Sequence, residues 1–125
     1  MISLKSYSDE VLAHFHAPKC CGRFTEDAPE IGTGLVGIAA SGDVVRLQVK
    51  VTDAVITDAC FKAQGTCATI AVASWVTSYI IQKSVQECQA LSCAEVLQAL
   101  QLTPLRKHSV LLVLDALNAA LNSLN

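Results

Sequence analysis

The chain has 125 residues, of which 52% are hydrophobic and 16% are charged. This length suits one domain with its own apolar core, so we expect a single domain over residues 1–125 and exclude a disordered chain. The net charge of −2 and the scattered cations exclude nucleic acid as a partner. The first residues lack the apolar core of a signal peptide, and no window approaches the roughly 20 apolar residues of a membrane span. We therefore expect a cytoplasmic protein with no membrane partner.

The N-terminal half predicts one helix followed by an antiparallel sheet. Residues 6–15 favour a helix, because Ser8 can cap it and acidic side chains occupy its first turn. Three strands are predicted after it, and the second alternates apolar and polar residues without a break. The connections between the strands are short, as is typical of an antiparallel meander over residues 34–40, 45–51 and 55–62.

The C-terminal half predicts helices only. The segment 67–82 is apolar on most sides, which is typical of a helix in the middle of the core. Two capping-box spacings follow, at Ser84 and Ser92, each with a glutamate three residues later. The last helix is predicted over 107–124, with a buried stripe formed by Val110, Leu111, Leu114, Leu117, Leu121 and Leu124. Strands followed by helices indicate the α+β class, here a three-stranded antiparallel sheet with helices packed on one face.

Three junctions between these elements carry residues that could form a metal site. Asp43 lies between the first two strands, Cys67 lies where the third strand meets the central helix, and His108 opens the last helix. Together they would supply one oxygen, one sulfur and one nitrogen ligand, a mixture that suits zinc or ferrous iron. A thiol at a helix start is also expected to ionise readily. Each residue has a simpler interpretation as a turn, first-turn or capping residue.

The six cysteines need an interpretation that suits a reducing compartment, where lasting disulfides are uncommon. No CxxC pair is present, which argues against a zinc ribbon or a thioredoxin-like motif. Cys88 and Cys93 fall in predicted helices and are interpreted as small buried hydrophobes. Cys20 and Cys21 fall in a loop after the first helix.

The chain resembles the iron–sulfur cluster assembly scaffold proteins of the IscU, SufU and NifU N-terminal type. The resemblance covers roughly residues 7 to 121, in order and without large gaps. It is carried by the segments 7–11, 32–37, 42–44, 47–51, 56–62 and 102–109. It implies a three-stranded antiparallel sheet packed by helices, and a scaffold that is not an enzyme. The implied partners are a cysteine desulfurase and other cluster-assembly proteins.

The resemblance also implies a set of site residues, of which this chain retains two. In the family, three cysteines and an aspartate hold a nascent cluster, aided by a histidine beside the third cysteine. Asp43 and His108 match the aspartate and the histidine, whereas the cysteine positions hold Ser41, Thr66 and Ser109. Hydroxyls are poor ligands for iron and cannot accept sulfur as a thiolate does.

Three hypotheses follow from this substitution. The first is a scaffold with an altered metal site that binds a [2Fe–2S] cluster, iron or zinc. Its ligands would be Asp43, Cys67 and His108, with Cys20 and Cys21 as further thiolates if their loop folds over the site. The second is a diverged paralogue without a cluster, an interaction or regulatory module that binds the desulfurase or a true scaffold. The third is a zinc or mononuclear iron protein that uses the same first three ligands.

Overall fold

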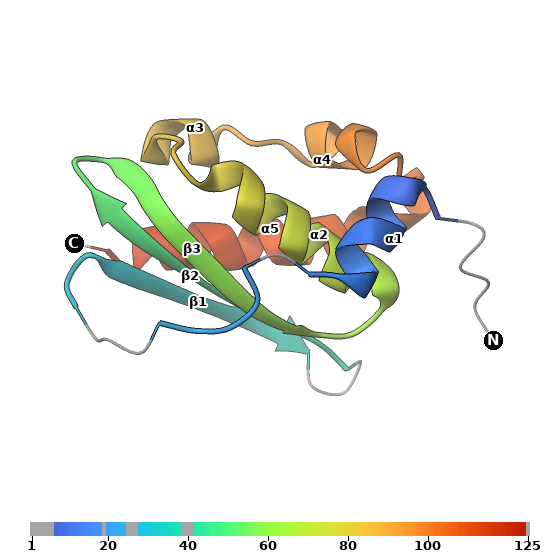
Figure 1. The fold of residues 1–125 in the computed structure, drawn as a ribbon, viewed down its shortest axis with the longest axis horizontal. Helices are drawn as coiled ribbons and strands as arrows, with labels where there is room; N and C mark the ends of the chain where they lie inside the picture. Colours follow the sequence, from blue (N-terminus) through green and yellow to red (C-terminus); the bar gives the residue numbers. More distant parts are fainter. Residues whose placement is uncertain (1–6, 19, 25–27, 39–41, 125) are drawn as a thin grey trace.

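The computed structural model describes residues 7–18, 20–24, 28–38 and 42–124. They form a three-stranded sheet with its helices on one face (Figure 1). In chain order the elements are α1 (Asp9–His16), β1 (Ile31–Ile38), β2 (Asp43–Thr52), β3 (Val55–Gln64), α2 (Cys67–Ile80), α3 (Val85–Gln89), α4 (Cys93–Ala99), the short 3-10 helix η2 (Pro104–Arg106) and α5 (Lys107–Asn122). The predicted α+β class is confirmed. No helix among these described residues is long and apolar enough to cross a bilayer.

The sheet is the predicted antiparallel meander, with strand order β1-β2-β3. The turn between β2 and β3 is tight, because Asp53 and Ala54 both adopt positive φ angles, of 53° and 62°. The strand β1 begins three residues before the predicted start, and the last two residues of that prediction, 39 and 40, lie outside the described residues. Short connections therefore set the topology, as the sequence indicated.

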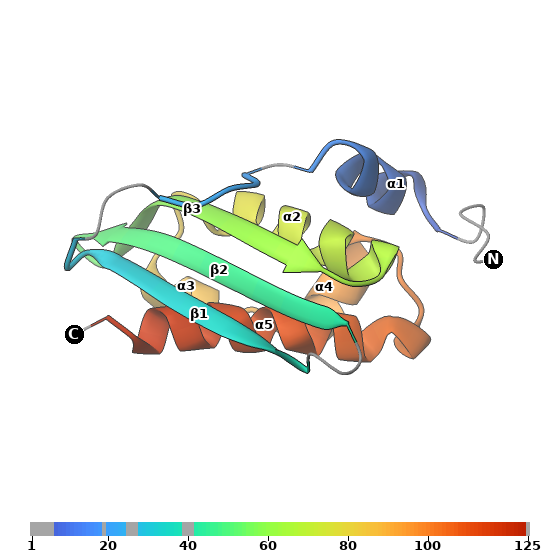
Figure 2. The same ribbon diagram turned by 90° about the horizontal axis from the view of Figure 1, so that it is seen from below.

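One face of the sheet carries the helices (Figure 2). On the other, which we call the open face, the described residues place no helix, and the segment 20–24 lies against part of it. On the covered face Val45, Leu47 and Val49 are fully buried, in agreement with the alternating pattern of β2. The helix α5 crosses β1 and β2, and α2 packs on β3. The approach of α5 is close: a Cβ atom at Gly34 would lie 2.1 Å from the carbonyl oxygen of Ala116. A glycine at this position is what lets the helix reach the strand.

The predicted helices form, with differences at their ends and faces. The capping box at Ser84 is complete, since Glu87 accepts a hydrogen bond from the backbone N–H of Ser84. Ser92 caps α4, but Glu95 accepts from the hydroxyl of Ser92 and not from its backbone N–H. Leu111 was expected in the buried stripe of α5, but it is 41% exposed. It lies one step of about 100° beyond the buried Val110, which turns its side chain toward solvent. Smaller residues complete the buried face of α5 instead, namely Val113, Ala116 and Ala120.

We predict that Gly34→Ala lowers the free energy of unfolding by about 2–3 kcal/mol, because the new methyl group would overlap the backbone of α5. Urea denaturation followed by circular dichroism measures the change. Leu35→Ala is the matched control, since the neighbouring side chain is 67% exposed, and it should change stability by less than about 0.5 kcal/mol. Equal effects of the two substitutions would contradict the close approach of α5 to β1.

Candidate functional site

The three junctions singled out in the sequence meet at one end of the sheet. The side chain of Asp43, at the start of β2, contacts both Thr66 before α2 and His108 in the first turn of α5. A hydrogen bond between Thr69 of α2 and Ser109 of α5 joins the starts of these two helices. The predicted convergence of Asp43 with His108 is therefore present. Ser41 lies outside the described residues.

Asp43 is fixed by the backbone that connects β3 to α2. Its Oδ1 atom accepts a hydrogen bond of 3.3 Å from the backbone N–H of Thr66. Gly65 makes room for the carboxylate, because a Cβ atom there would lie 2.1 Å from the same Oδ1 atom. The φ angle of Gly65 is +149°, which disfavours any other residue as well. One oxygen of Asp43 is thus held in place, and the other is left for a different partner.

The second oxygen of Asp43 faces His108. Its Oδ2 atom lies 3.7 Å from Nε2 of His108, close enough for an ion pair when the imidazole is protonated. The side chain of His108 is 66% exposed, whereas that of Asp43 is only 14% exposed. The arrangement is a fixed carboxylate beside an imidazole that solvent or a partner can reach.

Hydroxyl groups occupy the neighbouring positions and bind one another. The Oγ1 atom of Thr66 caps α2 by accepting a 3.2 Å hydrogen bond from the N–H of Thr69. The two threonine hydroxyls also share a hydrogen bond of 3.1 Å. The Thr69 hydroxyl then donates to Oγ of Ser109, again at 3.1 Å, and both of these residues are fully buried. We call Thr66, Thr69 and Ser109 the hydroxyl chain.

Thr69 was not among the residues that the sequence singled out. A signal for it was present, since it stands three residues after Thr66, the usual spacing between an N-cap and the amide it binds. Its bond to Ser109, 40 residues further on, could not be read from a local pattern.

Cys67 is the first residue of α2, but its environment differs from the one expected. Its side chain is half-buried and packs against the apolar core. Burial raises the pKa of the Cys67 thiol, and the nearby Arg106 cation lowers it by a smaller amount. The expectation of a readily ionised thiol is therefore wrong, because the loss of solvent around the thiol outweighs the attraction of Arg106.

The structure does not bring Cys20 and Cys21 to the Asp43–His108 pair. The carbonyl of Cys20 accepts a hydrogen bond from the N–H of Phe61, and Cys21 forms a short parallel bridge with the same residue. Phe61 pairs with Leu47, four residues after Asp43 along β2, which corresponds to about 13 Å. The loop therefore lies along the middle of β3 instead of folding over the end of the sheet.

The described residues do not supply a four-ligand cage for a metal or cluster. They contain no group of three or more His, Cys, Asp or Glu side chains that could hold a metal ion. The donors that do meet are one carboxylate, one imidazole and the hydroxyl chain, and hydroxyls do not replace thiolates as ligands for iron or zinc. Binding through Asp43, Cys67 and His108 thus stays a prediction.

The chain therefore combines an antiparallel sheet that carries helices on one face with an Asp–His pair between the start of β2 and the first turn of α5. Residues 6–125 match the family described as NifU-like N terminal domain, and the chain belongs to this family. The "Iron-sulfur cluster assembly scaffold protein IscU" of Buchnera aphidicola subsp. Schizaphis graminum is 39% identical over 118 residues, which are 94% of this chain and 92% of the relative.

A second relative agrees with this assignment, and a solved structure agrees with the fold. The protein of the same description from Escherichia coli K12 is 38% identical over 117 residues, covering 93% of this chain and 91% of its own. Among solved structures, the N-terminal NifU-like protein of Brucella abortus superposes with a TM-score of 0.74. That match has 16% sequence identity and covers 93% of this chain and 92% of the other, so it supports the fold alone.

We predict that Ser109→Ala destabilises the protein by about 1–2 kcal/mol, because it leaves the buried Thr69 hydroxyl without its acceptor. Thermal or urea unfolding measures the change. Thr103→Ala, which removes an exposed hydroxyl without a capping bond, is the control and should be close to neutral. A double-mutant cycle with Thr69→Val should give a coupling of about 0.5–1.5 kcal/mol. Additive effects of the two substitutions would contradict the bond.

We also predict that Cys67 reacts slowly with iodoacetamide at pH 8 in the folded protein, because burial raises the pKa of its thiol and only the thiolate reacts. The rate should increase as the pH rises further, and it should increase several-fold at pH 8 when the chain is unfolded in guanidinium chloride. Site-resolved mass spectrometry measures the rate, with the exposed Cys21 as the reference. Equal rates for Cys67 in the folded and unfolded chain would show that folding does not bury the thiol in a way that raises its pKa.

Proposed function

We propose that this chain acts in iron–sulfur cluster assembly as a scaffold-type protein with an altered metal site, and that it catalyses no reaction of its own. The observation that carries the proposal is the Asp43–His108 pair, held by Gly65 and Thr66 at one end of the sheet. The family to which the chain belongs supports the general role. The loss of cysteines at 41, 66 and 109 makes the site an altered one.

In this proposal the cargo is iron, zinc or a nascent [2Fe–2S] cluster. Asp43 offers an oxygen ligand and His108 offers its exposed imidazole. Cys67 would add a thiolate if the first turn of α2 shifts, because its half-buried side chain packs against the apolar core in the present arrangement. Cys20 or Cys21 would contribute only if their segment left the edge of β3. The thiolates are the ligands that make such a site selective for soft metals.

The partners in this role are a cysteine desulfurase, which supplies sulfur, and other cluster-assembly proteins. The cysteine thiols in this role must stay reduced, and the cytoplasm is a reducing compartment, so we propose that the protein acts there. We treat residues 1–125 as a single domain that presents the site at one end of its sheet.

Anaerobic reconstitution with iron, sulfide and a desulfurase tests the proposal. The wild-type chain should bind iron and develop visible absorbance, and both should weaken by at least about tenfold in Asp43→Ala and in Cys67→Ser. Cys93→Ser is the matched control, because Cys93 is the first residue of α4 and is not among the proposed ligands, and it should behave as the wild type. Zinc titration of the same proteins distinguishes a zinc site from an iron site. Equal binding by Asp43→Ala and the wild type would refute the proposed ligands.

The hydroxyl chain favours a second function, in which the protein is an interaction module that binds no cluster. Thr66 and Ser109 stand at two cysteine positions of the family, and their hydroxyls are already engaged through Thr69. A site closed by such bonds needs no metal to hold its shape. In this case the chain would bind the desulfurase or a true scaffold through its surface alone.

The two functions predict different outcomes for a variant with cysteine restored at residues 41, 66 and 109. If the chain is an interaction module, the wild type binds the desulfurase in calorimetry but develops no absorbance, and the restored variant gains a chromophore. If the chain is an altered scaffold, the wild type develops absorbance already. Failure of the wild type to bind the desulfurase at all would count against both functions.

A further inference from the structure

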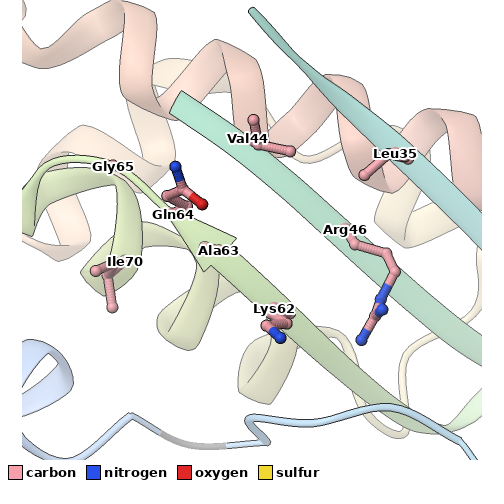
Figure 3. Close-up of a pocket in the computed structure, with 8 residues that line it drawn as sticks. All are labelled: Leu35, Val44, Arg46, Lys62, Ala63, Gln64, Gly65 and Ile70. Carbon is pink, nitrogen blue, oxygen red and sulfur yellow. The ribbon is translucent and has the colours of Figure 1, made fainter. Parts of the chain in front are cut away.

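The open face of the sheet carries a groove next to the candidate site (Figure 3). Its volume is about 630 Å³, within the range of about 300–1,000 Å³ that is typical of ligand pockets. Side chains from β1, β2, β3 and the start of α2 line it, so residues far apart in the sequence contribute to one surface. The helices cover the opposite face of the sheet, and the groove therefore belongs to the uncovered side.

Much of the groove is apolar although it faces solvent. Leu35 on β1 is 67% exposed, and Val44 on β2 and Ile70 on α2 extend the same apolar surface. Apolar side chains that gather on an open face and are bordered by charges are typical of a binding surface.

Two cations, Arg46 and Lys62, complete the lining of the groove. Arg46 and Lys62 stand directly opposite each other on β2 and β3, a placement of like charges that costs stability. Among the described residues, neither forms an ion pair with an Asp or Glu side chain. The Nη2 atom of Arg46 donates to the carbonyl of Gly22 at 3.4 Å, and its buried Nε atom has no hydrogen-bond partner within the described part of the chain. Both cations are suited to an acceptor from outside the molecule.

The groove also leads to the Asp43–His108 pair. Gly65 lines one end of the groove, and on the side of its missing Cβ atom it touches the carboxylate of Asp43. A segment that lies along β2 and β3 in this groove would therefore end beside the candidate site.

We propose that this groove binds a protein segment in which an apolar side chain is flanked by carboxylates. The apolar residue would pack on Leu35, Val44 and Ile70, and the carboxylates would pair with Arg46 and Lys62. A symmetric second copy of the chain is disfavoured, because it would bring the same cations together. Nucleic acid is disfavoured, because apolar side chains make up more of the groove than cations do. The inference rests on the proposed function for the existence of protein partners.

Selection from a randomised heptapeptide display library on the full-length chain tests the inference, and it requires neither metal nor desulfurase. The selected peptides should be enriched in Asp and Glu next to Leu, Ile, Met or Phe. A synthetic peptide of the consensus sequence should bind less tightly as salt increases. In heteronuclear NMR it should shift the backbone signals of Leu35, Lys62 and Ile70. Selection of peptides without acidic residues, or shifts confined to another surface, would overturn the proposal.

Charge reversal in the groove gives the matched comparison. Lys62→Glu, at an exposed position, should weaken binding of the consensus peptide by about tenfold or more, and Arg46→Glu should do the same. Lys83→Glu makes the same change in net charge beside Tyr79, outside the groove, and should bind as the wild type does. If all three variants weakened binding equally, the effect would come from net charge alone, and the proposed binding site would be wrong.

Binding of single-stranded DNA in competition with the peptide would assign the groove to nucleic acid instead. Since cluster reconstitution is measured separately, failure of the groove and failure of the proposed function are distinguishable.

Discussion

The hydrogen bond between Thr69 and Ser109 fixes the starts of α2 and α5 against each other, and the geometry of the site depends on this contact. Because both helices begin at the same end of the sheet, the residues before and within their first turns are brought beside Asp43. Gly65 then allows the carboxylate to approach the backbone, which no side chain at that position would permit. Two packed helices, one glycine and one buried hydroxyl pair thus determine where the exposed His108 stands.

Most of the fold could be predicted from the sequence, because it depends on local patterns. The strict alternation along 45–51 gave the buried face of β2, and the short connections gave the antiparallel order. Ser8 and Ser84 cap helices where their spacing indicated. The exposed Leu111 shows the limit of such reasoning. A run of leucines gives the period of a helix, but the side that faces the sheet is decided by small residues such as Ala116, where the strand comes closest.

The site could be predicted only in part, because its remaining contacts are long-range. Asp43 and His108 were expected to meet, since both stand at junctions of the chain, and they do. The direction of the Cys67 side chain could not be read from its place at a helix start, and burial reversed the expected effect on its pKa. The loop of Cys20 and Cys21 bonds to β3 through backbone groups, which leave no trace in the identity of the side chains.

The N-cap at Thr66 has a consequence for how this site can change. A threonine at the start of α2 stabilises the helix by about 1 kcal/mol relative to a residue that cannot cap, and cysteine is not among the residues that cap well. A cysteine at that position would therefore lower helix stability before any bound metal could compensate for it. At Ser109 the same substitution would disturb a second buried contact. The hydroxyls at 66 and 109 thus oppose the introduction of a thiolate: a single substitution at either position is uphill in free energy, and only a bound metal could offset the loss.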